Sequence, residues 1–474
     1  MRKILLLLFF FPLIIQAQNS TAFRKNYDYS LFDFPANIVE GVTANTYILA
    51  GYGITTGVVS QLNDTGGIVW SYSYNTLLND VKKDASNSQY YLCGSKSNDA
   101  ILLILDANGN IVLSSKFNIP EADDATFNRV IKASDGGYVA VGYVTGYDPD
   151  GGGAEIKFSP ITYTDNNGDS QTDYISSPLI VKFDASGNHV WHQVFRYYQT
   201  SNIPANRIYN DAGFSDVTEV SDGYVAVGSY DIANHRVVQD SDGDDASPTD
   251  ALLLKTTTAG AITYHKQVDA PSTSTSQTSK ELSAVNTTSA GAIIAGGTDD
   301  SRELIQKFSG VGGFSNSFSR RFTYSTFFGI PDPSVVSQIY EVSGGTDLVT
   351  MTMYIKPLSF FSNATHRVNP TATSNVWAKH YDFPNSFTII PKGSLTSDGG
   401  YISASMGAGG GANYDFHVIK TDNTGDSPLT GCPATSFTPT ASAATTTFAD
   451  PFYNSWSGTP GSNSVTITKA SIGL

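Results

Sequence analysis

Hydrophobic positions along this chain come in short runs bounded by polar turns, a pattern typical of β-strands. Each run is rich in Tyr, Val and other apolar residues, follows a polar turn and ends in a small residue. The clearest copies are Gly137–Gly142 and Gly223–Gly228, and other copies occur at 46–51, 89–94, 291–296, 347–351 and 400–404. The chain therefore contains seven copies of one strand pattern.

A second strand pattern follows each of the first six copies as a hairpin. In Leu102–Val112 and Leu179–Trp191, an Asn-Gly or a Ser-Gly pair separates two β-rich runs. Such pairs supply the positive φ angles that a tight hairpin needs. A weaker strand precedes the Tyr/Val run, as in Phe127–Ile131. Each unit therefore contains four predicted strands, and repeated four-stranded units of this length indicate the blades of a β-propeller.

The spacing of the units fits this interpretation. Tyr47, Tyr91 and Tyr138 occupy equivalent positions and are separated by 44 and 47 residues. Two later gaps are longer, and insertions at 144–178 and 230–250 account for them. Both insertions fall between the second and third strands of neighbouring units, so we expect them to lie side by side on one face of the ring.

The last unit indicates how the ring closes. It has a third strand at Phe416–Lys420 but no recognisable fourth strand. Near the start of the chain, Phe23–Tyr29 matches the fourth strand of the sixth unit, Trp377–Phe383. We therefore predict an all-β, seven-bladed propeller over residues 22–431, in which an N-terminal strand completes the last blade and removes its exposed edge.

The segments outside the repeats suggest export. Residues 1–17 combine a basic start, a 12-residue apolar run and a small residue for cleavage, as signal peptides do. The apolar run is too short to span a bilayer, and we expect no transmembrane segment in the mature chain. We expect a secreted or cell-surface protein, with the periplasm as a further location. Residues 432–474 are rich in Thr and Ser, and we expect a linker-like tail with a short β segment at Ser464–Lys469.

Charge narrows the possible partners. The formal net charge is −15 and the chain has no basic run, which argues against nucleic acid and anionic membranes. Each insertion contains six acidic residues and one basic residue, so the acidity is local. The only cysteines are Cys93 and Cys432, too few for a zinc cluster, and their pairing stays open. Cys93 lies within a predicted strand and is expected to be a buried thiol.

These repeats resemble the Gly/Tyr-rich propeller repeats of secreted proteins of the Bacteroidetes type. The hairpin at 106–112 also resembles repeats of pyrroloquinoline-quinone and bulb-lectin propellers. Exported proteins of this kind often end in a sorting domain for type IX secretion, which the tail at 433–474 does not contain in complete form.

The insertions contain candidate calcium ligands. Residues 165–173 have the form D-x-N-G-D-x-x-x-D, which resembles the calcium loop of integrin-type FG-GAP propeller repeats. That resemblance implies ligation by oxygen atoms of Asp165, Asn167, Asp169 and Asp173. The loop at 240–250 keeps three of the positions as Asp240, Asp242 and Asp244, with Asp250 as a substitute for the fourth. The alternative is a solvated acidic loop whose Asp and Asn residues only form turns.

Catalytic motifs are missing from the sequence. There is no Gly-x-Ser-x-Gly, no His-Glu-x-x-His and no phosphate-binding loop. His189 and His192 are three residues apart on a predicted strand, so we expect them on opposite faces and at the surface. Trp70, Trp191 and Trp377 occupy one repeated position, which favours packing between blades over a platform for sugars.

We therefore expect a monomeric, exported and calcium-stabilised propeller that binds a glycan or a protein through its insertion-bearing face. No catalytic or cofactor-binding residue is predicted. The alternatives are an extracellular carbohydrate-active hydrolase or lyase, a quinone-dependent oxidoreductase, and a purely structural or adhesive module.

Overall fold

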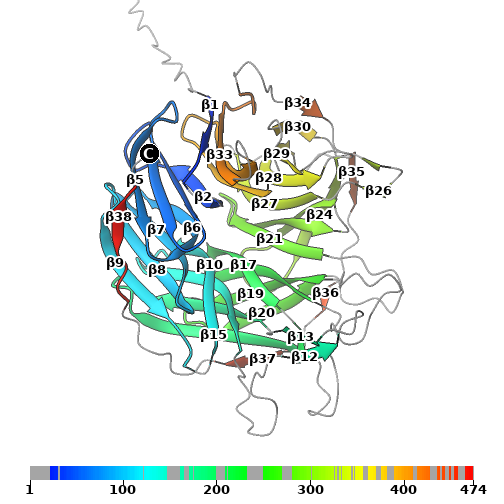
Figure 1. The fold of residues 1–474 in the computed structure, drawn as a ribbon. Coiled ribbons are helices and arrows are strands. Elements are labelled where there is room, and N and C mark those ends of the chain that lie inside the picture. The colour runs from blue at the N-terminus through cyan, green and yellow to red at the C-terminus, as the bar shows by residue number, and fades with distance from the viewer. Residues whose placement is uncertain are drawn as a thin grey trace, which may run out of the picture.

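The seven repeated units fold into seven antiparallel four-stranded sheets arranged around an axis, as a computed structural model shows (Figure 1). This confirms the predicted seven-bladed β-propeller. No helix long and apolar enough to cross a membrane occurs among the residues described. The structure describes residues 22–29, 33–120, 122–146, 161–164, 170–173, 176–198, 209–210, 212–231, 249–268, 280–299, 302–324, 326–327, 330–331, 334–342, 345, 347–355, 361–369, 375–381, 389–408, 414–427, 435–437, 440–443, 448–449, 453–456 and 465–472.

In each blade the innermost strand is the first of its unit, and the following strands lie progressively outward. Blade 1 contains β2 (Phe34–Glu40), β3 (Tyr47–Tyr52), β4 (Gly57–Leu62) and β5 (Ile68–Tyr74). Blade 2 contains β6 (Leu77–Asp84), β7 (Gln89–Lys96), β8 (Asp99–Asp106) and β9 (Ile111–Phe117). Blade 3 contains β10 (Asp124–Lys132), β11 (Tyr138–Thr145), β14 (Ser176–Phe183) and β15 (His189–Tyr198). Blade 4 contains β17 (Ala212–Val220), β18 (Gly223–Asp231), β19 (Thr249–Thr257) and β20 (Ile262–Val268).

The remaining blades follow the same order. Blade 5 contains β21 (Lys280–Thr287), β22 (Ile293–Asp299), β23 (Arg302–Phe308) and β24 (Asn316–Thr323). Blade 6 contains β27 (Ser334–Glu341), β28 (Leu348–Ile355), β29 (Phe361–Val368) and β30 (Asn375–Tyr381). Blade 7 contains β31 (Ile389–Leu395), β32 (Tyr401–Ala408), β33 (Tyr414–Thr421) and, from the start of the chain, β1 (Phe23–Tyr27). Short extra strands are β12 (Ile161–Thr164), β13 (Ser170–Asp173), β16 (Tyr209–Asn210), β25 (Thr326–Phe327) and β26 (Ile330–Pro331).

The N-terminal strand closes the ring as predicted. β1 pairs antiparallel with β33, so that Phe23 lies opposite Lys420 and Tyr27 lies opposite Phe416. Phe23 and Tyr27 are both buried and pack with residues of blade 1. The last blade is therefore built from β31, β32 and β33 together with the first strand of the chain, β1, which forms its outermost strand.

The small residue that ends the Tyr/Val pattern has a specific structural reason. Each innermost strand contains a β-bulge or similar irregularity at an equivalent place. In blade 3 this bulge brings the carbonyl oxygen of Thr126 so close to Gly142 that a Cβ atom there would lie 1.9 Å from it. In blade 2 a Cβ atom on Gly94 would lie 2.0 Å from the carbonyl oxygen of Leu77. The glycine therefore occurs where the bulge of the neighbouring strand leaves no room for a Cβ atom, and the two features repeat together.

The bulged residues also link neighbouring blades. The side-chain amide of Asn79 donates to the carbonyl oxygen of Phe127 at 2.9 Å, and that of Asn128 donates to the carbonyl oxygen of Phe214 at 2.9 Å. Ser283 makes the same contact to Val336 between blades 5 and 6. Hydrogen bonds around the axis thus fix the angle between blades, in addition to the apolar packing between their faces.

The C-terminal segment forms a belt around the outside of the ring. It adds fifth strands to blades 6, 5, 4, 3 and 1, which are β34 (Thr435–Phe437), β35 (Thr440–Ala443), β36 (Phe448–Ala449), β37 (Tyr453–Trp456) and β38 (Lys469–Ser471). Over blade 2, Ser114 donates a hydrogen bond to the carbonyl oxygen of Val465 at 2.9 Å. The outermost strand of a sheet offers free backbone donors and acceptors at its edge. The described parts of the tail at 432–474, which we expected to be linker-like, pair with these edges and cover them.

Candidate functional site

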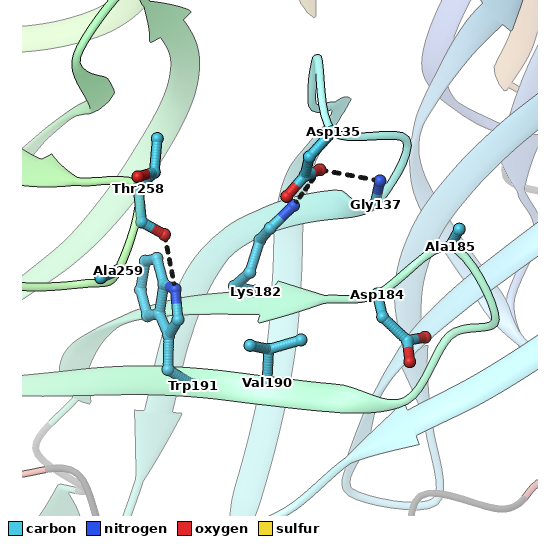
Figure 2. A pocket seen from close by; sticks show the side chains of 9 residues that line it. All are labelled: Asp135, Gly137, Lys182, Asp184, Ala185, Val190, Trp191, Thr258 and Ala259. Carbon is cyan, nitrogen blue, oxygen red and sulfur yellow. Dashed lines mark hydrogen bonds and ion pairs between the residues drawn. The ribbon is translucent and has the colours of Figure 1, made fainter.

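A groove of about 430 Å³ lies between blades 3 and 4, at the end of the strands where first joins second and third joins fourth. Three tight turns build it: the β10–β11 turn, the β14–β15 turn and the β19–β20 turn of the next blade. Figure 2 shows the residues that line the groove. These are Asp135, Gly137, Lys182, Asp184, Ala185, Val190, Trp191, Thr258 and Ala259.

The apolar wall of the groove comes from β15. The indole N–H of Trp191 donates to the carbonyl oxygen of Thr258 at 3.0 Å, which fixes the ring against blade 4 (Figure 2). One part of the ring packs on Gly260, where a Cβ atom would lie 2.7 Å from it. Beside it, Val190 is 54% exposed. Trp191, whose position is fixed by its hydrogen bond, and the exposed Val190 thus form one apolar surface that is accessible to solvent.

An ion pair forms the polar wall. The Lys182 ammonium lies 2.6 Å from a carboxylate oxygen of Asp135, which also accepts from the backbone N–H of Gly137 at 2.9 Å (Figure 2). The hydrogen bond from Lys182, which outweighs burial, lowers the pKa of Asp135. The Asp135 side chain is 58% exposed, whereas that of Lys182 is 4% exposed. The carboxylate is therefore ionised at neutral pH and accessible to a ligand.

A second carboxylate, Asp184, lies at the base of the β14–β15 turn. It accepts from the side-chain amide of Asn188 at 3.0 Å and from the backbone N–H of Asn188 at 2.8 Å. These hydrogen bonds, led by the one from the side chain, lower its pKa. Both carboxylates of the groove thus stay charged at neutral pH, and neither has the raised pKa that a general acid needs.

The expectation that His189 and His192 lie on opposite faces at the surface is wrong. Their rings are hydrogen-bonded, with Nε2 of His189 2.9 Å from Nδ1 of His192, and His192 is buried. The reason is a bulge in β15: Trp191 lies opposite Lys182 and His189 lies opposite Phe183, which leaves Val190 as the extra residue. An extra residue reverses the alternation of the strand, so an offset of three brings two side chains to one face.

The same bulge raises Val190 to the surface, and it recurs in other blades. Val69 and Val376 precede Trp70 and Trp377 in the same way and are 56% and 48% exposed.

The interblade packing expected of the tryptophans is confirmed, because Trp70 and Trp377 contact the turn glycines of the next blades as Trp191 does. The sequence did not predict the groove. The repeated tryptophan indicated packing between blades, and no feature of the sequence indicated the bulge in β15 that exposes Val190 beside Trp191.

Most of the predicted calcium ligands lie outside the described residues. This holds for Asp165, Asn167, Asp169, Asp240, Asp242 and Asp244. Asp173 is the last residue of β13, which pairs antiparallel with β12, so that Ile161 lies opposite Asp173. Asp250 lies in β19, is 1% exposed, and accepts hydrogen bonds from Gln267 and, at 3.4 Å, from Tyr230. Within the parts of the chain that the structure describes, no three His, Cys, Asp or Glu residues gather into a metal-binding group.

The remaining sequence expectations concern the thiols and the insertions. Cys93 is buried, and burial raises the pKa of its thiol. Cys432, whose pairing with Cys93 was left open, lies outside the described residues.

The insertions leave from the ends of β11 and β18, at the opposite end of the strands from the groove. The strands from which the insertions leave therefore end at the face of the ring opposite to the groove.

The fold defines the chain as a seven-bladed β-propeller, with a groove of about 430 Å³ between blades 3 and 4. No protein-family description matches the chain, and no curated protein matches it. Solved structures with a similar fold include the β-propeller domain of Cps50 (Swd1) from Myceliophteria thermophila, at 9% identity and a TM-score of 0.45, covering 84% of this chain and 99% of that one. The Dos1 propeller has 10% identity and a TM-score of 0.41, covering 85% and 95%. A protein of unknown function from Dyadobacter fermentans has 10% identity and a TM-score of 0.40, covering 84% and 97%.

Proposed function

We propose that this protein is an exported binding module and that the groove between blades 3 and 4 binds a glycan. The observation that carries the proposal is the pairing of a fixed, partly open indole, Trp191, with an exposed and ionised carboxylate, Asp135. The C–H face of a sugar ring packs on an indole, whose face is electron-rich. A carboxylate and the turn backbone accept hydrogen bonds from the sugar hydroxyls.

The charges of the groove favour binding over hydrolysis. A glycoside hydrolase needs one carboxylic acid that stays protonated until it donates to the leaving group. Asp135 and Asp184 both have lowered pKa values, because hydrogen bonds stabilise their ionised forms. The groove therefore holds acceptors for hydrogen bonds rather than an acid–base pair, which supports a binding module over the carbohydrate-active enzyme considered above.

Export and calcium belong to the same proposal. Residues 1–17 would direct the chain outward, and the loops at 165–173 and 240–250 would each bind calcium and stiffen the insertions. A ligand site on the insertion-bearing face is the competing location for the same function. Because that face and the groove lie at opposite ends of the strands, separate substitutions distinguish them.

The test is binding of a panel of soluble oligosaccharides, followed by titration calorimetry with the best ligand. Val190→Asp places a charge in the apolar wall, and we expect it to weaken binding at least tenfold. The matched control is Val69→Asp, at the equivalent and equally exposed position of blade 1, which we expect to bind as the unmodified protein does. Asp135→Asn removes the charge of the polar wall and should also weaken binding.

Two outcomes would overturn the location or the function. If Asp165→Ala with Asp169→Ala abolishes glycan binding while Val190→Asp leaves it intact, the ligand binds on the insertion-bearing face and the groove is not the site. If no member of the panel binds to the full chain, the glycan proposal is wrong.

A further inference from the structure

The charges of the groove between blades 3 and 4 are divided unevenly between its surface and its base. Among its nine lining residues, Asp135 and Asp184 carry carboxylates and Lys182 carries the cation. The Asp135 side chain is exposed and Asp184 is partly exposed, whereas Lys182 is buried. A ligand that enters the groove therefore meets the carboxylate of the ion pair rather than its ammonium group.

Lys182 is held on two sides within the protein. Its ammonium group lies 2.6 Å from Oδ1 of Asp135 and 5.8 Å from the ring centroid of Tyr224 in blade 4 (Figure 2). An ammonium group over the face of an aromatic ring is attracted by the electrons of that ring. The cation is thus engaged by the protein itself and gives no exposed positive charge that could attract an anionic ligand.

A third carboxylate lies beside the turn that carries Asp135. Glu219 of β17, in blade 4, accepts from the backbone N–H of Ser134 at 2.8 Å and from its hydroxyl group at 2.7 Å. Burial, followed by the charges of Asp135 and Glu219, raises the pKa of the Tyr224 hydroxyl, so both carboxylates act on one point between the blades. Negative charge therefore surrounds the β10–β11 turn, in addition to Asp184 at the β14–β15 turn.

The apolar wall of the groove suits a cation as well as a sugar ring. Trp191 is fixed by its hydrogen bond to Thr258, so its ring is already placed before a ligand arrives. Among aromatic side chains, the indole attracts cations most strongly. A hydrogen bond from a charged donor to a carboxylate is roughly twice as strong as one between neutral groups. A sugar that carries an ammonium group therefore gains on both walls, whereas a neutral sugar offers hydroxyl groups alone.

We propose that the groove selects glycans built from amino sugars with free amines, of the glucosamine type, over neutral and acidic glycans. This inference rests on the proposed function and specifies the ligand of the same site. The protonated amine donates to Asp135 or Asp184, while the C–H face of the sugar ring packs on Trp191. Uronic acids and sulfated sugars bring negative charge against the exposed carboxylates, which disfavours them.

The test compares three tetrasaccharides with the same β-1,4-linked backbone, which carry an amine, an acetamide group or a hydroxyl group at C2. They are the tetramers of glucosamine, N-acetylglucosamine and glucose. Titration calorimetry with the full chain at pH 6, where the amines are protonated, measures the dissociation constant of each. We expect the glucosamine tetramer to bind at least tenfold more tightly than the other two. A tetramer of galacturonic acid should not bind, and added salt should weaken the glucosamine tetramer most.

Two substitutions at one position isolate the charge of the ligand. Val190→Asp and Val190→Lys both interrupt the apolar wall at an exposed side chain, and they introduce charges of opposite sign. We expect Val190→Lys to bind the glucosamine tetramer at least fivefold more weakly than Val190→Asp does, because its ammonium group repels the amine. The two variants should not differ in their affinity for the glucose tetramer.

Asp184→Asn removes one carboxylate without touching the ion pair of Lys182. We expect it to weaken binding of the glucosamine tetramer at least threefold. The matched control is Asp106→Asn in blade 2, which we expect to bind as the unmodified protein does. Asp106 occupies the equivalent turn and accepts from Asn110 as Asp184 does from Asn188, but the position of Trp191 is taken there by a leucine.

The outcomes separate this inference from the proposed function. If the glucose tetramer binds as tightly as the glucosamine tetramer and loses equal affinity in Val190→Asp and Val190→Lys, the groove binds glycans without selecting amines, and this inference alone is wrong. If the glucosamine tetramer binds but Val190→Lys and Asp184→Asn leave its affinity unchanged, the selection does not arise in the groove, which also contradicts the inference. If no glycan binds at all, the proposed function fails and this inference fails with it.

Discussion

The hydroxyl group of Tyr27 donates a hydrogen bond to the carbonyl oxygen of Gly66 at 2.6 Å and thereby joins blade 7 to blade 1. The same bond recurs from Tyr74 to Gly109 at 2.7 Å and from Tyr381 to Gly425 at 2.8 Å. In each case the outer strand of one blade binds the third turn of the next. β1 is therefore equivalent to the fourth strand of the other blades, because it makes the same hydrogen bond to the next blade.

Tyr27→Phe removes this bond without creating a cavity. We expect it to lower the free energy of unfolding by about 1 kcal/mol, because the carbonyl of Gly66 loses a buried donor. The measurement is urea unfolding followed by tyrosine and tryptophan fluorescence. Tyr74→Phe is the matched variant within one continuous segment and should cost a similar amount. A cost for Tyr74→Phe with none for Tyr27→Phe would show that β1 does not hold the ring closed.

Arg129 is 3% exposed and lies between two buried carboxylates, with its Nη1 3.1 Å from Asp80 and its Nε 3.7 Å from Asp216. Arg129→Met leaves both carboxylates without their shared cation. We expect a loss of about 3–5 kcal/mol, because the remaining charges stay in a poorly solvated place. Arg367→Met is the control: Arg367 pairs with Asp347 at 2.8 Å, but its side chain is 25% exposed, so we expect about 1 kcal/mol or less. Unfolding in urea measures both, and equal losses would contradict the buried role of Arg129.

Two buried histidines predict acid sensitivity. Burial, together with His189, lowers the pKa of His192 to about 3, and burial, together with Arg24, lowers that of His417 to about 4. A histidine in the unfolded chain has a pKa near 6.5, so the unfolded state binds more protons between about pH 6.5 and 4. Stability should therefore be complete above this window and fall as the pH decreases through it, by up to about 1.4 kcal/mol per unit for each histidine.

The measurement is the free energy of unfolding from pH 8 to pH 4.5. His192→Gln and His417→Gln should each flatten the dependence, whatever they do to stability at pH 8. A wild-type profile that stays flat to pH 4.5 would show that these rings are accessible to protons in the folded protein.

Calcium should stabilise the chain if the insertions bind it. Saturation at 100 times the dissociation constant adds about 2.7 kcal/mol, and chelation with EDTA should reverse the gain. Asp165→Ala with Asp169→Ala should remove most of the effect of calcium on the melting temperature. Asp64→Ala, in an exposed turn of blade 1, is the control and should keep it. A melting temperature that does not respond to calcium would leave the two acidic loops as solvated turns.

The belt should depend on its one buried side chain among residues 465–470, Ile467. This residue packs with the core between blades 1 and 2, whereas Thr466 beside it is exposed. We expect Ile467→Asp to release β38, seen as faster hydrogen exchange at Lys469–Ser471, with little change in the rest of the ring. Thr466→Asp should leave exchange unchanged. Equal exchange in both variants would mean that strand pairing alone holds the belt.

The sequence predicts the ring because every blade repeats the same local signals. The match between Phe23–Tyr29 and Trp377–Phe383 placed the closing strand correctly, since Phe23 and Tyr27 occupy the positions of Trp377 and Tyr381. The buried ion pairs of Arg129 with Asp80 and Asp216, and the histidine pair, could not be predicted, because both depend on bulges that reverse strand alternation. A signal for the bulges of the innermost strands does exist: glycines such as Gly94 and Gly142 repeat where the neighbouring carbonyl approaches.

The route of the belt brings the last described strand to blade 1, next to the first strand of the chain in blade 7. The ring of Phe23 contacts the turn at Gly66, and the backbone N–H of Ile472 donates to the carbonyl oxygen of Ser71 at 3.3 Å. The first described strand, in blade 7, therefore lies against blade 1, and the last described strand pairs with blade 1, after the described segments have run once around the axis and back in the opposite sense. A circular permutant that joins them through a short linker, and that starts in the tight turn at 97–98, should fold to the same ring. Fusion partners attached at either end would project from a single sector and leave the far side of the disc unobstructed.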